Sequence, residues 1–230
     1  MAERGYCSRR KAEELIREGK VTVDGVLVTE PGFKAEKNAE IVVEGKKLVY
    51  EEKVYFLLNK PKNVISSAKD DKGRITVVDL IDTDARIYPL GRLDYDSSGL
   101  ILLSNDGELM QKLIHPSHEV TKVYEVTVNK LVTKEEIERL ERGVRIDSYV
   151  SAPAQIRLLR QNENKKTSFL EVSIHEGKNR EIRKMFKTIG ATVTKLNRIK
   201  EAGLELGDLR PGEYRRLKPY EVQKLKRELD

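Results

Sequence analysis

The pattern of hydrophobic and polar positions predicts short strands that are interrupted by single helices. In the first part of the chain, Ser8 begins a helix with one apolar face, and Gly19 ends it. Valines then alternate with polar residues on both sides of Asp24-Gly25, which is typical of a hairpin over residues 20–28. A further strand at 41–43 completes a unit that is too small to bury a large core by itself.

After a charged linker at 44–53, the pattern predicts a larger α+β unit with a mostly antiparallel sheet, because runs of strands are broken by single helices without regular alternation. We therefore expect a small domain over residues 1–49 and a larger one over 50–230. The predicted strands of the larger unit are 54–58, 86–90, 100–103, 122–128, 154–159, 167–175, 193–199 and 214–217. Its predicted helices are a short one near 77–81, then 107–114, 133–143, 179–189 and a last one after Pro219.

The composition excludes several classes of protein. One cysteine among 230 residues, Cys7, leaves no internal disulfide and no multi-cysteine zinc site. No apolar stretch approaches the ~18 residues of a membrane span, and no signal peptide opens the chain. We therefore expect a cytoplasmic protein that does not enter the membrane.

The distribution of charge is more informative than the net charge of +6. Residues 176–200 hold eight basic and two acidic residues, a surplus equal to that of the whole chain. A milder basic cluster, with six basic and three acidic residues, lies at 4–20. Two separate basic clusters favour a polyanion such as nucleic acid, although two solvated helix faces would give the same pattern.

The segment from Gly91 to Leu100 is the densest in possible chemistry, with two aspartates between two glycines on a loop. A calcium loop of the EF-hand type fails, because Asn105 stands where a glutamate is required and a strand follows. Two interpretations stay open: a structural turn, or a catalytic carboxylate from Asp94 or Asp96. His115 and His118 flank a proline without a third ligand, so we expect loop residues and no metal site.

The same segment, Gly-Arg-Leu-Asp-x-x-Ser-x-Gly-Leu, resembles the catalytic signature of the RNA pseudouridine synthases, in the branch that modifies single positions of ribosomal RNA. Residues 55–61, Lys122-Val-Tyr124 and 176–186 resemble the other motifs of this family, in the same order. Residues 8–25 are similar to the small RNA-binding domain of the ribosomal αL type. That domain usually opens with another short helix, which we expect to be absent here.

The resemblance implies the pseudouridine synthase fold, with a mostly antiparallel mixed sheet, flanking helices and the small RNA-binding domain. It also implies an enzyme that isomerises uridine to pseudouridine without metal or cofactor. Asp94, Tyr124 and Arg183 align with the catalytic aspartate, the tyrosine under the target base and the basic partner of the aspartate; Ile182 and Arg92 would line the pocket. Without the resemblance, the sequence favours Arg183 as part of a solvated helix face and Tyr124 as a core residue of a strand. Asp96 is expected to cap the loop.

The implied partner is ribosomal RNA or a pre-ribosomal particle, bound by a monomer. The residues expected to bind RNA are Arg9, Arg10, Lys11, Lys178, Arg180 and Lys184. The resemblance is greatest to enzymes that act on 23S large-subunit RNA. Two alternatives stay open: a 16S small-subunit enzyme of the same branch, and a non-catalytic ribosome-assembly factor that binds ribosomal RNA.

Overall fold

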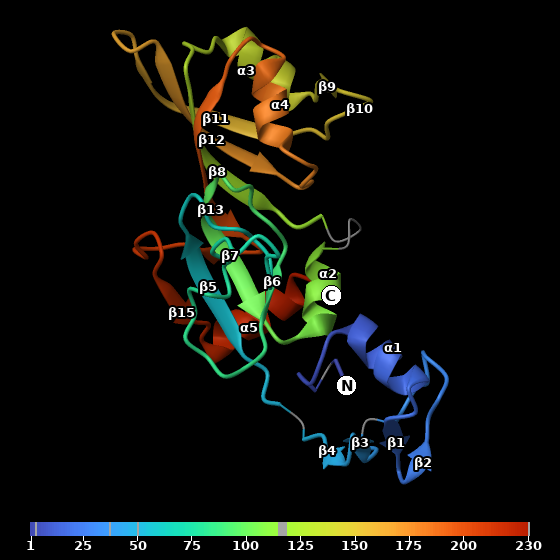
Figure 1. Cartoon of the computed structure of the whole chain (residues 1–230). Helices are drawn as coiled ribbons and strands as arrows, with labels where there is room; N and C mark the ends of the chain where they lie inside the picture. Colours follow the sequence, from blue (N-terminus) through green and yellow to red (C-terminus); the bar gives the residue numbers. More distant parts are fainter. Residues whose placement is uncertain (3, 37, 50, 115–118, 230) are drawn as a thin grey trace.

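The computed structural model describes residues 1–2, 4–36, 38–49, 51–114 and 119–229. These residues form a small N-terminal unit and a larger unit that is built on one long mixed sheet (Figure 1). His115 and His118, which were expected to be loop residues, and residue 50 at the expected domain limit lie outside the described residues.

The N-terminal unit contains one helix and four short strands. They are α1 (Arg9–Arg17), β1 (Val21–Val23), β2 (Val26–Leu27), β3 (Ile41–Val43) and β4 (Lys46–Lys47), with the strands in the order β2-β1-β3-β4. The Ser8 side chain accepts a hydrogen bond from the Lys11 backbone N–H and caps α1, as predicted. Asp24 and Gly25 both have positive φ, as the predicted two-residue hairpin turn requires. The apolar residues of this unit form a core of their own.

The long sheet explains the alternating pattern of the rest of the chain. Its strands are β5 (Tyr55–Lys60), β6 (Tyr88–Leu90), β7 (Ser98–Ser104), β8 (Lys122–Val128), β11 (Gln155–Asn162), β12 (Thr167–Ile174), β13 (Val193–Glu201), β14 (Leu204–Glu205) and β15 (Tyr214–Arg216). The main order is β11-β12-β8-β13-β7-β5-β15, with β14 beside β13 and β6 beside β7. Only the pair β13–β7 is parallel among these, so the α+β fold with a mostly antiparallel mixed sheet is confirmed.

Helices cover the sheet in two places and close two further cores. The helices α3 (Lys134–Glu141) and α4 (Glu181–Lys187) contribute to one, and α2 (Gly107–Ile114) and α5 (Pro219–Arg227) to the other (Figure 1). A small hairpin, β9 (Arg145–Ile146) and β10 (Tyr149–Val150), lies beside α4. In the part of the chain that the structure describes, no helix is long and apolar enough to span a bilayer.

Several predicted elements differ from the observed ones for local reasons. The helix predicted near 77–81 is wrong: the Asp79 carboxylate accepts hydrogen bonds from the backbone N–H and the hydroxyl of Thr76, and the segment forms turns instead. The helix predicted at 179–189 is shorter, because Arg180 has a left-handed φ of 54°. The expected linker 44–53 contains β4, and the hairpin β9–β10 was not predicted.

Candidate active site

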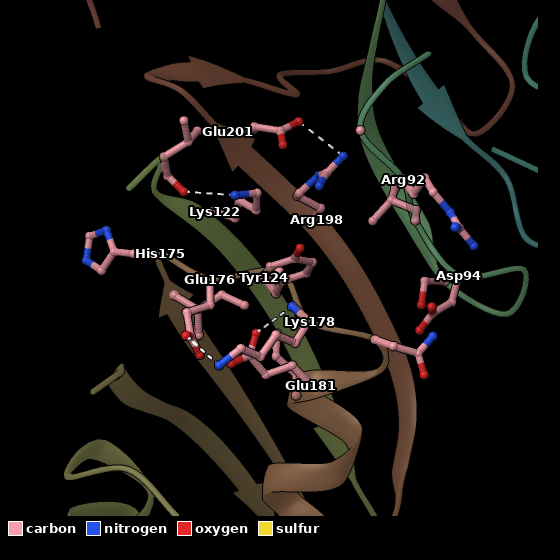
Figure 2. A pocket seen from close by; sticks show the side chains of 18 of the residues that line it. Arg92, Asp94, Lys122, Tyr124, His175, Glu176, Lys178, Glu181, Arg198 and Glu201 are labelled. Carbon is pink, nitrogen blue, oxygen red and sulfur yellow. Dashed lines mark hydrogen bonds and ion pairs between the residues drawn. The ribbon is translucent and has the colours of Figure 1, made fainter. Parts of the chain in front are cut away.

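A cavity of about 1110 Å³ lies where the loop before β7 meets β8, β13 and the start of α4 (Figure 2). Four of the residues predicted for the site line it: Arg92, Asp94, Tyr124 and Ile182. The parallel pair β13–β7 makes this possible, because it places the loop 91–97, which carries Asp94, one strand away from the strand that carries Tyr124. Residues from four distant parts of the chain therefore meet at one concave site.

The backbone on both sides of Asp94 is held by hydrogen bonds. The Ser66 hydroxyl accepts from the Leu93 N–H at 3.1 Å and donates to the Leu93 carbonyl at 2.9 Å. After Asp94, the N–H of Ser97 donates to the Asp94 carbonyl at 3.1 Å. The Lys60 ammonium donates to the Ser97 carbonyl at 2.9 Å. Such a fixed loop keeps a carboxylate in one place, which catalysis requires.

The two aspartates of this loop face two arginines of the α4 segment in different ways. Asp96 makes the short contacts: its carboxylate lies 3.0 Å from Nη1 of Arg180 and 3.1 Å from Nη2 of Arg183. Asp94 lies farther away, with Oδ2 at 3.7 Å from Arg180 Nη1 and 3.8 Å from Arg183 Nε. Asp96, which was expected to cap the loop, instead forms ion pairs with both arginines. Asp94 lies close enough to feel the charge of both arginines, but its oxygens are left available to a substrate.

Burial and charge act in opposite directions on these groups. Burial lowers the pKa of the Arg183 guanidinium, while Asp96 and Asp94 favour its charged form. Burial also raises the pKa of the Asp96 carboxyl, but the hydrogen bond from Arg180 and the charge of Arg183 outweigh it, so the pKa of Asp96 lies below its usual value. The two arginines therefore keep Asp96 ionised.

Arg183 is itself almost covered and does not line the cavity. Its side chain is 12% exposed, and it donates from Nη1 to the Val193 carbonyl at 3.0 Å and from Nη2 to Ser97 Oγ at 3.3 Å. Its Nε has no hydrogen-bond partner among the described residues and lies toward Asp94. The solvated-face alternative for Arg183 is therefore wrong, because this arginine lies behind the loop 91–97.

Tyr124 and Ile182 form apolar parts of the cavity wall. Both are buried, Tyr124 on β8 and Ile182 on α4, and both belong to the main core cluster. Burial raises the pKa of the Tyr124 phenol. Arg92, by contrast, is exposed at the edge of the cavity beside Asp94 (Figure 2).

Three residues expected to bind RNA near the site contact carboxylates instead of lying free. Arg180 contacts Asp96, Lys178 lies 2.8 Å from Glu176, and Lys184 lies 2.8 Å from Asp147. The Lys178 ammonium also lies 4.0 Å from the centre of the Tyr149 ring. In the small unit, Arg9, Arg10 and Lys11 are exposed on α1, and Lys11 lies 3.0 Å from Glu14.

The first turn of α1 also faces the larger unit. When the Gln111 amide is oriented with its oxygen toward Arg9, it accepts from both terminal nitrogens of that guanidinium, at 3.3 and 3.2 Å. Figure 1 shows α1 beside α2, the helix that carries Gln111. Arg9 therefore contributes to the junction between the units as well as to the basic face of α1.

Sequence reasoning missed several charged groups at the site. Lys60 is completely buried behind the loop 91–97, and burial lowers its pKa to about 8. Glu181 and Glu176 lie side by side at the cavity; burial and the neighbouring Glu176 raise the pKa of Glu181 to about 7. The sequence signal for Lys60 was its place at the end of an apolar strand, directly before a proline. The two glutamates gave none beyond lying in the basic motif.

Comparison with known proteins assigns this fold and site to a class of RNA-modifying isomerases. The family model "RNA pseudouridylate synthase" matches residues 54–188, more than half of the chain, and the S4 domain model matches residues 1–41. The chain therefore belongs to the RNA pseudouridylate synthase family.

Individual relatives are similar over nearly the whole length. Ribosomal large subunit pseudouridine synthase B of Bacillus subtilis (strain 168) is 50% identical over 227 residues, which cover 98% of this chain and 93% of the relative. An uncharacterized RNA pseudouridine synthase of Aquifex aeolicus (strain VF5) is 37% identical, with 98% and 91% covered. A crystal structure of a pseudouridylate synthase superposes with a TM-score of 0.71 at 29% identity, covering 97% of this chain and 96% of that one.

Proposed function

We propose that this protein isomerises one uridine of large-subunit ribosomal RNA to pseudouridine, with Asp94 as the catalytic carboxylate. The observation that carries the proposal is that the two aspartates of the loop before β7 make different contacts. Asp96 takes the short contacts of Arg180 and Arg183, while Asp94 lines the cavity with both arginines 3.7–3.8 Å away. The likeness to the large-subunit enzyme of Bacillus subtilis supports the choice of RNA.

The chemistry requires no net change in oxidation state. The bond between the ribose C1′ and N1 of uracil breaks, the ring turns, and a bond from C1′ to C5 forms. The hydrogen on C5 leaves as a proton, and N1 gains one, so atoms and charge balance. A carboxylate at the junction of sugar and base can promote this exchange as a nucleophile or as a base.

The other cavity residues have roles that follow from their positions. Tyr124 and Ile182 offer buried apolar surface to a uracil ring, which has to leave its stack to reach Asp94 at a cost of a few kcal/mol. Arg92 is exposed beside Asp94 and would contact the RNA backbone at the cavity mouth. Arg183 would hold the loop and its negative charge in place from behind.

We further propose that ribosomal RNA is held by both units, within limits of 1–49 for the RNA-binding domain and 50–230 for the catalytic one. Arg9, Arg10 and Lys11 of the S4 domain would contact phosphates away from the target base. Lys178, Arg180 and Lys184 would do so at the cavity rim by exchanging their carboxylate partners for phosphate. The protein would act as a monomer in the cytoplasm, without metal or cofactor.

Release of tritium tests the proposed function. Large-subunit RNA carrying uridine tritiated at C5 is prepared from a strain that lacks the Bacillus subtilis relative, and the protein is added. We expect the wild-type chain and Asp208→Asn, a change at an exposed aspartate outside the cavity, to release tritium from one site. We expect Asp94→Asn to release none, and release by that variant at the wild-type rate would overturn the assignment.

A further inference from the structure

Arg198 is a buried arginine in the cavity wall to which the family resemblance gave no role. It is 2% exposed and is among the largest of the fully buried side chains in the described part of the chain. It lies on β13, between β8, which carries Tyr124, and β7, which follows the loop of Asp94. In the register of the sheet, Arg198 pairs with Tyr124 of β8 on one side and with Gly99 of β7 on the other.

The contacts of Arg198 fix both neighbours. Its Nε donates to the Leu100 carbonyl of β7 at 2.7 Å. Its backbone passes so close to Gly99 that a Cβ on that glycine would lie 2.2 Å from the Arg198 carbonyl oxygen. Nη2 lies 3.1 Å from the Glu201 carboxylate, which is 1% exposed and also lines the cavity. The strand is irregular between Arg198 and Lys200, as is common beside active sites.

Stability alone does not account for such a pair. Desolvation of two charges offsets most of their attraction, and well-packed apolar side chains of similar volume are often as stable or more stable. We therefore expect the pair Arg198–Glu201, which lies in the wall of the cavity, to have a role in the reaction there. Among the described residues, Arg198 forms its ion pair with Glu201, in contrast to Arg183, which contacts both loop aspartates.

Besides Glu201, Arg198 lies next to Tyr124, its partner across the β8–β13 pair. Burial raises the pKa of Tyr124, while the positive charge of Arg198 beside it acts in the opposite direction. Figure 2 shows both side chains on the same wall of the cavity, with the guanidinium between the tyrosine and Glu201. Arg198 is thus placed with its charge beside the Tyr124 side chain, while its Nε donates to Leu100 of β7, the strand that follows the loop of Asp94.

We propose that Arg198, anchored by Glu201, is a positioning residue that sets Tyr124 and the base of the catalytic loop in register with each other. This inference rests on the proposed function and adds to it Arg198, a residue that acts through Tyr124 and the loop of Asp94. Misplacement of reacting groups by about 1 Å can reduce a rate by ~10²-fold, so this is the loss expected when the guanidinium is removed.

The test compares Arg198→Met and Arg198→Lys with a matched control, Arg215→Met, which removes an arginine from another ion pair of the same sheet, outside the cavity. Single-turnover tritium release measures chemistry, RNA binding is measured separately, and the ¹³Cζ resonance of labelled Tyr124 at neutral pH reports the surroundings of its phenol. We expect Arg198→Met to lower the rate by ~10²-fold with little loss of RNA affinity, and to move the Tyr124 resonance. Arg198→Lys should recover part of both effects, and Arg215→Met should show neither.

Two results would overturn the inference while the proposed function stands: a near-wild-type rate in Arg198→Met, or a rate loss with the Tyr124 resonance unmoved. If Arg198→Met does not fold, Arg198→Lys decides by the same two readouts. Failure of the proposed function gives a different result, because Asp94→Asn would then release tritium as well as the wild type does.

Discussion

At the scale of single residues, Asp94 and Asp96 of the loop before β7 are expected to differ in their response to mutation. Asp96→Asn removes the short ion pairs of Arg180 and Arg183 but leaves the carboxylate of Asp94 in the cavity. We expect its single-turnover rate to fall by roughly 10- to 100-fold, because the arginines and the loop lose their anchor, and to remain measurable. A loss as complete as that in Asp94→Asn would contradict the division of tasks between the two residues.

Glu181 is expected to make stability depend on pH. Its pKa is raised from 4.5 to about 7 by burial and by Glu176, so the folded protein holds this proton more tightly than the unfolded chain does. The stabilisation is complete below the unfolded pKa and is lost as the pH rises through the folded one. Between about pH 5.5 and about pH 8, we expect the wild type to lose roughly 1–3 kcal/mol of unfolding free energy relative to Glu181→Gln.

Urea denaturation of both proteins at the two pH values measures this difference. In the same window Glu176, whose pKa is lowered, is ionised whether the chain is folded or unfolded, so its contribution stays constant. Equal pH dependence in the wild type and in Glu181→Gln would show that Glu181 is ionised in the folded protein throughout.

At the scale of elements, the parallel contact between β7 and β13 depends on Gly99. This residue has φ of +110°, and a Cβ there would lie 2.2 Å from the Arg198 carbonyl, so the strands would have to separate. We expect Gly99→Ala to cost roughly 2–4 kcal/mol of unfolding free energy and to abolish tritium release. Gly107→Ala is the matched control, because this glycine begins α2 with open space around it and should gain up to about 1 kcal/mol. Equal stability of the two variants would refute the close contact.

Most elements could be predicted from the sequence because their signals are local. The capping box at Thr133 and Glu136, the turn at Asp24-Gly25 and the alternation along β8 depend on neighbours in the chain. The start of α4 could not be predicted, because Arg180 adopts a left-handed conformation and contacts Asp96, 84 residues away.

The residues of the candidate site could likewise be predicted only where the sequence signal is local or matches a motif. Asp94, Tyr124 and Arg183 were found through motifs that resemble those of a family. Arg198 and Glu201 became visible only when the sheet brought them together, because an isolated charge in a strand gives no sign of being buried.

At the scale of the whole molecule, the basic segment 176–200 is less available to RNA than its surplus of charge suggests. Six of its eight basic residues lie within 4 Å of a carboxylate: Lys178, Arg180, Arg183, Lys184, Arg198 and Lys200. Lys187 and Lys195 are exposed and have no such partner among the described residues. The local surplus is therefore largely balanced by acids from other parts of the chain.

This balance predicts how salt affects RNA binding. We expect Lys187→Gln and Lys195→Gln each to reduce the slope of log K against log salt by about 0.7–0.9, the value for one lost phosphate contact. Lys184→Gln should reduce it less, because this lysine has to leave Asp147 before it can bind phosphate. Filter binding over a series of salt concentrations measures the slopes, and the largest change in Lys184→Gln would contradict the expectation.

The most direct test of the function is a map of pseudouridine across all ribosomal RNA. The measurement uses a Bacillus subtilis strain that lacks its large-subunit pseudouridine synthase B and carries either this protein or its Asp94→Asn variant. We predict that the wild-type chain restores one pseudouridine, in the large-subunit RNA, and that Asp94→Asn restores none. Restoration in small-subunit RNA, no restoration by the wild type, or restoration by Asp94→Asn would contradict the proposed function.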